Sequence, residues 1–78
     1  MRILFFAHLK DITGCAQTDL AADNIDTPEL WRRLIATYPG LAPQQSQVRL
    51  ARNCDFATAD THFYSGDEVA LIPPVSGG

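Results

Sequence analysis

One stretch near the middle of the sequence has the periodicity of an amphipathic helix, and this stretch constrains the fold most. Leu30, Leu34 and Tyr38 recur every four residues and form an apolar stripe along one side. Thr27 can cap the start of this helix, and Pro39-Gly40 ends it. A chain of 78 residues has room for one domain with one core. A single amphipathic helix then needs one sheet to cover its apolar side.

The rest of the chain predicts short strands. Apolar or alternating segments indicate strands at residues 2–7, 16–22, 48–52, 56–59 and 68–72. We expect a hairpin loop at residues 8–15, a second loop at residues 41–47 and a chain reversal at residues 53–55. The order of these elements predicts an α+β fold with the helix packed on one face of the sheet.

Charge and cysteine content exclude several classes of protein. The net charge is −3 and the six basic residues are scattered, whereas a nucleic-acid-binding protein needs a dense basic stripe. An acidic surface fits basic protein partners, although it is as typical of any solvated domain. Two cysteines are too few for a zinc site or an iron–sulfur cluster within one chain, and free thiols are typical of a reducing compartment. No apolar run is long enough to span a membrane, so we expect a cytoplasmic protein.

The last six residues carry the clearest chemical signal. The chain ends Pro73-Pro74-Val75-Ser76-Gly77-Gly78, and two consecutive prolines cannot donate to a sheet, so the final strand must end near Ile72. We expect a domain at residues 1–72 and an extended tail at residues 73–78 that reaches at most about 20 Å. The two glycines make the tip narrow. Taken alone, such an ending is more typical of a frayed terminus.

A terminal carboxylate on a tail of this kind can be converted into a sulfur donor. ATP can convert the carboxylate to an acyl-adenylate, which the sulfur of a persulfide can attack. The resulting thiocarboxylate is anionic near neutral pH and offers a soft nucleophilic sulfur. The compact domain, the rigid Pro-Pro exit and the di-glycine end together predict a carrier whose working group is the carboxyl of Gly78.

Three segments resemble the sulfur-carrier (small) subunits of molybdopterin synthase, within the ubiquitin-like β-grasp group. They are Leu4-Phe5-Phe6-Ala7, Asn53 and Gly66-Asp67-Glu68-Val69-Ala70-Leu71-Ile72-Pro73-Pro74-Val75-Ser76-Gly77-Gly78. The last of these is highly specific for the family, and the first is only supportive. Arg52 stands where an aliphatic residue is usual. The resemblance implies a β-grasp fold with a mixed sheet of about five strands.

The resemblance also implies a sulfur-transfer cycle centred on Gly78, with Gly77 beside it. An adenylyltransferase of the ubiquitin-activating type would adenylate Gly78 with ATP and magnesium, and a sulfurtransferase would supply sulfur. The tail would then enter the large subunit of molybdopterin synthase, in a heterotetramer, and deliver sulfur to cyclic pyranopterin monophosphate. The chain itself would bind no cofactor or metal and would not be an enzyme on its own.

Strand parity predicts where partners dock. Ile3, Phe5 and Ala7 should lie on one face of the first strand, and Leu4 and Phe6 on the other. Since one helix covers one face, Phe6, Phe56 and Ile72 should form an exposed apolar patch beside the tail. Partner contacts would continue along Pro73, Pro74, Val75 and Ser76. The alternative is that the three apolar residues are ordinary core residues.

Two other functions remain open from the sequence. The same tail chemistry could serve thiamine synthesis, cysteine synthesis or tRNA thiolation, although the Pro-Pro-Val-Ser lead-in favours the molybdopterin branch. Alternatively, the chain could be a non-catalytic ubiquitin-like binding module that uses only its surface. An independent enzyme is disfavoured because the sequence contains no recognisable nucleophile–base pair, phosphate-binding loop or metal-binding cluster.

Overall fold

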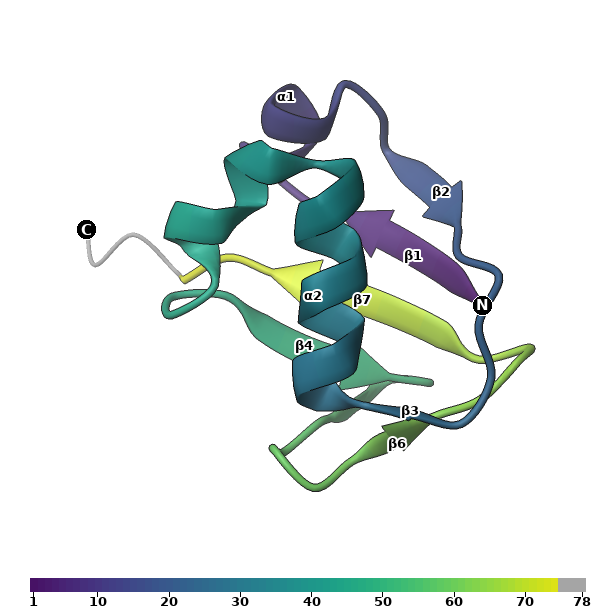
Figure 1. Cartoon of the computed structure of the whole chain (residues 1–78). Helices are drawn as coiled ribbons and strands as arrows, with labels where there is room; N and C mark the ends of the chain where they lie inside the picture. Colours follow the sequence, from purple (N-terminus) through teal and green to yellow (C-terminus); the bar gives the residue numbers. More distant parts are fainter. Residues whose placement is uncertain (75–78) are drawn as a thin grey trace.

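The computed structural model describes residues 1–74 and has an α+β fold (Figure 1). Its elements, in chain order, are β1 (Arg2–Phe5), α1 (Leu9–Thr13), β2 (Gln17–Asp19), β3 (Ile25–Asp26), α2 (Thr27–Thr37), the 3₁₀ helix η1 (Pro39–Gln44), β4 (Arg49–Arg52), β5 (Asp55–Phe56), β6 (His62–Phe63) and β7 (Glu68–Ile72). The main sheet has five strands in the order β2-β1-β7-β4-β5, and β3 and β6 form a separate pair. Helix α2 lies across one face of the main sheet (Figure 1).

The main sheet is mixed, as predicted, because its central strand β7 runs parallel to β1 on one side and antiparallel to β4 on the other. β1 and β7 pair in parallel, with Leu4 opposite Ala70, and the other pairs are antiparallel. β7 is hydrogen-bonded on its other side to β4, with Ala51 opposite Ala70. The strand that leads into the C-terminal tail is therefore held on both edges.

Helix α2 forms where the sequence predicts a helix, but its cap differs. The side chain of Asp26, rather than Thr27, accepts a hydrogen bond from the Glu29 backbone N–H at 3.0 Å. Thr27 instead donates its hydroxyl to the Thr58 carbonyl at 2.7 Å. The cap prediction was wrong because the chain reaches the helix from β3, which leaves Asp26 extended and in the capping position.

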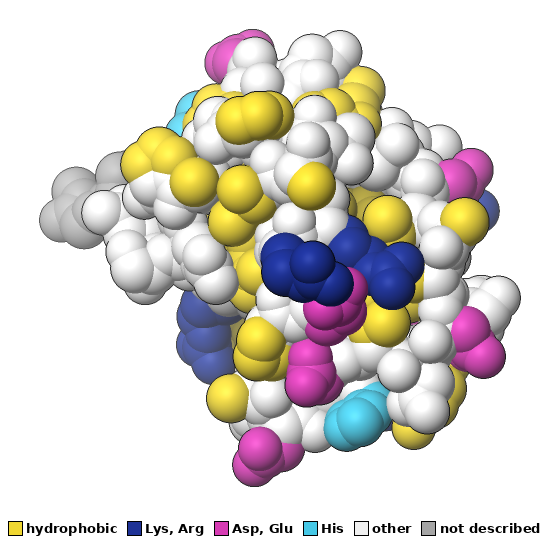
Figure 2. Space-filling view, in the orientation of Figure 1, with side chains coloured by type: hydrophobic (Ala, Val, Ile, Leu, Met, Phe, Trp, Pro, Cys, Tyr) yellow, Lys and Arg dark blue, Asp and Glu magenta, His cyan; other side chains and the backbone are white. Residues whose placement is uncertain are grey.

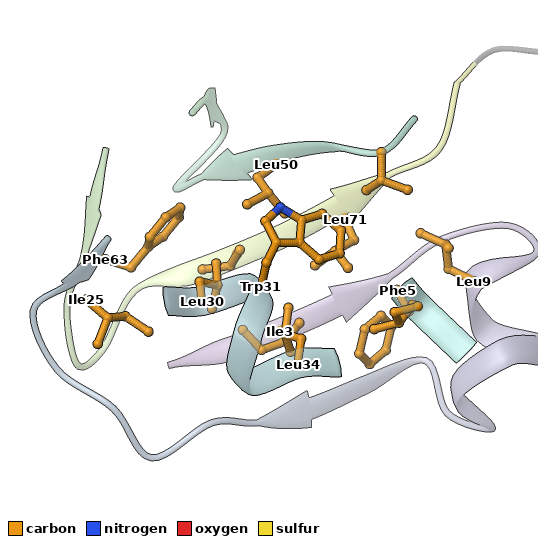
Figure 3. Packing of buried hydrophobic residues seen from close by; sticks show 13 residues of the cluster. Ile3, Phe5, Leu9, Ile25, Leu30, Trp31, Leu34, Leu50, Phe63 and Leu71 are labelled. Carbon is orange, nitrogen blue, oxygen red and sulfur yellow. The ribbon is translucent and has the colours of Figure 1, made fainter. Parts of the chain in front are cut away.

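The apolar side of α2 and one face of the sheet form the core (Figure 3). Leu30, Trp31 and Leu34 of α2 are buried, as are Ile3 and Phe5 of β1. The remaining core residues come from other elements: Leu9, Ile25, Leu41, Val48, Leu50, Phe63, Val69 and Leu71. Tyr38 is half-buried and packs edge-on against Phe5, with ring centroids 5.5 Å apart. The predicted stripe is thus the helix side that faces the sheet.

The opposite side of α2 carries charged side chains, which gather over the helix in Figure 2. Glu29 lies 2.6 Å from the Nη2 of Arg32 and 2.8 Å from the Nε of Arg33. Hydrogen bonds from Arg32, and then from Arg33, hold the pKa of the Glu29 carboxyl below its usual value. This side of the helix therefore offers paired charges rather than an apolar surface.

Two segments predicted as loops contain helical turns. Residues 8–15 include α1, which ends at Gly14 in the left-handed conformation with φ 78°. Residues 41–47 overlap η1, in which Leu41 is fully buried. Both short helices place one leucine in the core, Leu9 and Leu41, and these tertiary contacts are absent from local sequence patterns.

The predicted strands are present, but several are shorter. β1 ends at Phe5, and Ala7 is exposed with φ 53°, so Ala7 does not share the face of Ile3. The predicted strands at 16–22 and 56–59 become β2 and β5. The two-residue strands β3 and β6 were not predicted; they pair Ile25 with Phe63, both buried. β7 matches its predicted bounds at both ends.

Candidate functional site

The site begins where β7 ends at the C-terminal side of the main sheet. Ile72 is the last residue of β7 and pairs with Arg49 of β4. Pro73 is half-buried and Pro74 is exposed, and neither is part of a strand. Val75, Ser76, Gly77 and Gly78 were predicted to carry partner contacts and the reactive carboxyl; they lie outside the described residues.

The face of the sheet opposite α2 has an apolar hollow of about 260 Å³, here called the open-face hollow. Its floor and one side are formed by residues that lie opposite one another on successive strands: Leu4 of β1, Ala70 of β7, Ala51 of β4 and Phe56 of β5. The full lining is Leu4, Phe6, Ala51, Cys54, Phe56, Glu68, Ala70 and Ile72. Two alanines in the middle, with larger side chains around them, make the surface concave.

The hollow brings together the three residues predicted to form an apolar patch. Phe6, Phe56 and Ile72 all line it. Phe6 is 46% exposed and Phe56 is 58% exposed, so these two rings are not core residues. Ile72 is half-buried and connects the hollow to the start of the tail. That a partner binds at this surface remains a prediction, which the exposure of two aromatic rings on an apolar surface supports.

Leu4, Ala51, Ala70, Cys54 and Glu68 also line the hollow, and sequence reasoning did not include them in the patch. Strand parity already places Leu4 on the face of Phe6. To predict that Ala51 and Ala70 lie in the patch, one would need the register between β4 and β7, which pairs residues far apart in the chain. No local signal in the sequence specifies that register.

Charged groups lie at two sides of the hollow. Arg2 and Glu68 face each other on β1 and β7, with Arg2 Nη1 3.4 Å from Glu68 Oε2. The guanidinium carbon of Arg49 lies 4.0 Å from the centroid of the Phe56 ring, a cation–π contact. The hollow is therefore apolar in the middle, with an ion pair on one side and a cation stacked on an aromatic ring on another.

A hydrogen-bond network fixes the turn that carries Phe56. The reversal between β4 and β5 lies within the predicted residues 53–55 and uses left-handed backbone at Asn53 (φ 50°) and Cys54 (φ 74°), whereas Asp55 already belongs to β5. Asn53 Nδ2 donates to Asp67 Oδ1 at 3.1 Å, and its Oδ1 accepts from the Glu68 N–H at 2.9 Å. The turn is thereby tied to the start of β7, next to the hollow.

Asp67 is held ionised by this network. The Tyr64 backbone N–H donates to Asp67 Oδ2 at 2.8 Å. This bond, together with that from Asn53, outweighs partial desolvation and keeps the pKa of the Asp67 carboxyl below its ordinary value of 3.8. Asp67 thus acts as an acceptor that orders the turns beside the hollow.

Within residues 1–74, no group of three or more His, Cys, Asp or Glu side chains could hold a metal ion. His8 bonds to Gln44 of η1 at 3.1 Å, and His62 of β6 bonds to Asn24 at 3.0 Å. Cys15 and Cys54 are free thiols. No helix among residues 1–74 is long and apolar enough to cross a membrane.

Comparison with known proteins identifies the family. The sequence pattern of the ThiS family matches residues 3–78. The chain belongs to the ThiS family. Curated relatives described as "Molybdopterin synthase sulfur carrier subunit" include a protein of Escherichia coli K12, 35% identical over 100% of this chain and 99% of the relative. The Homo sapiens protein of the same description is 32% identical over 100% of this chain and 93% of its own length.

Solved structures of related proteins share the fold. The crystal structure of SAMP1 from Haloferax volcanii matches with a TM-score of 0.85 and 26% identity, over 99% of this chain and 97% of that one. A subunit in the complex of subunits 1 and 2 of the molybdopterin-converting factor from Helicobacter pylori matches with a TM-score of 0.71 and 27% identity, over 99% and 96% of the two chains. The predicted β-grasp fold and family resemblance are confirmed.

Proposed function

We propose that this ThiS-family chain is the sulfur carrier subunit of a molybdopterin synthase, and that the carboxyl of Gly78 carries the sulfur. The curated relatives that support this role match the full length of the chain. The observation that carries the proposal is structural: β7, in the middle of the sheet, leads from the open-face hollow directly into the segment that ends in Gly77-Gly78.

The proposed chemistry has three steps. The Gly78 carboxylate attacks the α-phosphate of ATP, pyrophosphate leaves, and a glycyl adenylate forms on the activating enzyme. The terminal sulfur of a persulfide then attacks the carbonyl carbon, AMP leaves, and a thiol reduces the S–S bond of the acyl persulfide to release the thiocarboxylate. Its sulfur finally attacks cyclic pyranopterin monophosphate on the large subunit, and water then cleaves the resulting thioester, which leaves the sulfur on the pterin and returns the Gly78 carboxylate. The chain supplies a sulfur that is consumed and loaded again at each turnover, and the chain binds no cofactor of its own.

The partners follow from these steps. The Helicobacter pylori structure is a complex of two converting-factor subunits, which supports a large-subunit partner for this chain. An adenylyltransferase of the ubiquitin-activating type, using ATP and magnesium, and a sulfurtransferase complete the cycle. We further propose a cytoplasmic location, because the two cysteines of the chain are free and such thiols are typical of a reducing compartment.

The test is a reconstituted synthase reaction with variants at the end of the chain. Removing Gly78, or adding one alanine after it, should abolish molybdopterin formation from cyclic pyranopterin monophosphate, because the reactive carboxyl is lost or displaced. Both variants should still bind the large subunit, since the open-face hollow is unchanged. Mass spectrometry of the wild-type chain should locate sulfur on Gly78.

Unchanged sulfur delivery by either variant would refute the role of Gly78. A thiocarboxylated wild-type chain that forms no molybdopterin with the large subunit would instead favour a carrier for thiamine, cysteine or tRNA thiolation. A chain that acquires no sulfur from the activating enzyme and sulfur donor would favour a ubiquitin-like binding module.

A further inference from the structure

The position of Arg49 differs from that of the other arginines of the chain. Arg49 lies on β4 on the same face as Ala51, opposite Ile72, and therefore between the open-face hollow and the tail. Its side chain is exposed, yet its guanidinium lies over the Phe56 ring at 4.0 Å. The ring therefore covers one side of the cation.

The N–H donors of Arg49 are unused within residues 1–74. Every other arginine donates to an oxygen: Arg2 to Glu68, Arg32 and Arg33 to Glu29, and Arg52 to the His62 carbonyl at 2.6 Å. Among the described residues, no hydrogen bond or ion pair involves the Arg49 side chain. A guanidinium that stacks through its face keeps all five N–H groups at its edge available.

A protein that docks on the hollow must also cover this cation. Phe56 lines the hollow and is 58% exposed, and Arg49 rests on the same ring, so a partner that covers the ring desolvates the guanidinium. Burying a charge without a counter-charge is costly, whereas a carboxylate can accept two parallel hydrogen bonds from an arginine edge.

We propose that Arg49 pairs with an Asp or Glu carboxylate of the large synthase subunit and is a specificity-determining contact of that interface. The inference rests on the proposed function for the identity of the partner. The positive charge of Arg49 calls for a carboxylate on the partner, even though the net charge of the whole chain is −3. The pairing fixes the orientation of the partner on the hollow, because two borders of the hollow differ chemically. One border carries the apolar ring of Phe6, and another carries the Arg49–Phe56 stack.

The experiment measures the affinity of the full-length chain for the large subunit, at low and high ionic strength, with three variants. Arg49→Gln removes the charge, Arg49→Lys keeps it without the planar edge, and Arg33→Gln removes an equal charge from the opposite side of the molecule as a control. We expect Arg49→Gln to raise Kd by about tenfold or more and to lose much of the salt dependence. Arg49→Lys should lose less affinity, and Arg33→Gln should bind like the wild type.

Three results would overturn the contact. Wild-type affinity of Arg49→Gln would show that no carboxylate faces Arg49. Equal losses in Arg49→Lys and Arg49→Gln, with salt dependence retained, would assign the effect to stacking on Phe56. A salt-sensitive dimer of the isolated wild-type chain that Arg49→Gln abolishes would assign the contact to a second copy.

Turnover separates this inference from the proposed function. At saturating large subunit, thiocarboxylated Arg33→Gln should form molybdopterin at the wild-type rate, because Arg33 pairs with Glu29 on α2 and does not line the hollow. If the wild-type chain binds but forms no product, the proposed function fails while the affinity series still decides the contact. If the wild-type chain is active and all variants bind equally, only the Arg49 contact fails.

Discussion

Replacing Phe6 with aspartate tests whether the open-face hollow is a docking surface. Phe6 lines the hollow and is 46% exposed, so about half of its ring remains for a partner to cover. Complete burial of a phenylalanine side chain contributes about 1.5–3 kcal/mol, so covering this half is worth about 1 kcal/mol. The carboxylate placed there must in addition be desolvated, so the total loss should reach at least about tenfold in Kd for the large subunit.

The fold should tolerate the same substitution. Phe6 follows the end of β1 and points away from the core, so Phe6→Asp should retain one cooperative unfolding transition with a midpoint lowered by loss of the buried half of the ring. Tyr64→Asp is the matched control, since Tyr64 is 45% exposed, receives the same charge change and does not line the hollow. Calorimetric titration would measure binding, and circular dichroism would measure unfolding.

The reasoning is refuted by either of two outcomes. Loss of cooperative unfolding in Phe6→Asp would show that Phe6 belongs to the core. Equal weakening by Tyr64→Asp would show that added negative charge, rather than the apolar surface of the hollow, determines affinity.

Two further predictions concern stability. Asp26→Ala removes the cap of α2 and should lower the free energy of unfolding by about 1 kcal/mol in urea titrations, whereas Asp19→Ala on exposed β2 should change it little. The bonds from Tyr64 and Asn53 depress the pKa of folded Asp67 below 3.8, so this carboxylate stabilises the fold above that pH and the contribution is lost as the pH falls through the lower folded value. Melting temperatures measured from neutral to acidic pH should therefore fall more for the wild type than for Asp67→Asn, and parallel curves would contradict the role of the network.

The elements that sequence reasoning located correctly are those with signals in their own residues. β7 begins after the turn at Gly66, which has φ 92°, and ends before Pro73, and its bounds match the prediction. α2 has an apolar stripe of period four and a proline near its start. Phe6 and Phe56 were placed together because parity and the presence of one covering helix leave one face of the sheet open.

The elements that were missed depend on contacts between distant residues. α1 has five residues and β3 and β6 have two each, too short for a periodic pattern. Each is stabilised by a buried apolar side chain: Leu9 in α1, Ile25 in β3 and Phe63 in β6. The Arg49–Phe56 stack likewise depends on pairing of β4 with β5, and nothing in the local pattern predicts it.

The topology suggests how the proposed docking on the open-face hollow is connected to the proposed chemistry at Gly78. β7 is paired on both edges, so a partner seated on the open-face hollow holds Ile72 in a known position relative to itself. The six residues that follow can extend at most about 20 Å, whatever path they take. If Gly78 carries the sulfur, as proposed, a partner's reaction centre lies within that distance of its contact with Ile72. If a narrow entrance leads to that reaction centre, the two glycines can pass through it and a bulkier ending cannot. One residue added after Gly78 should then stop the reaction while leaving binding intact.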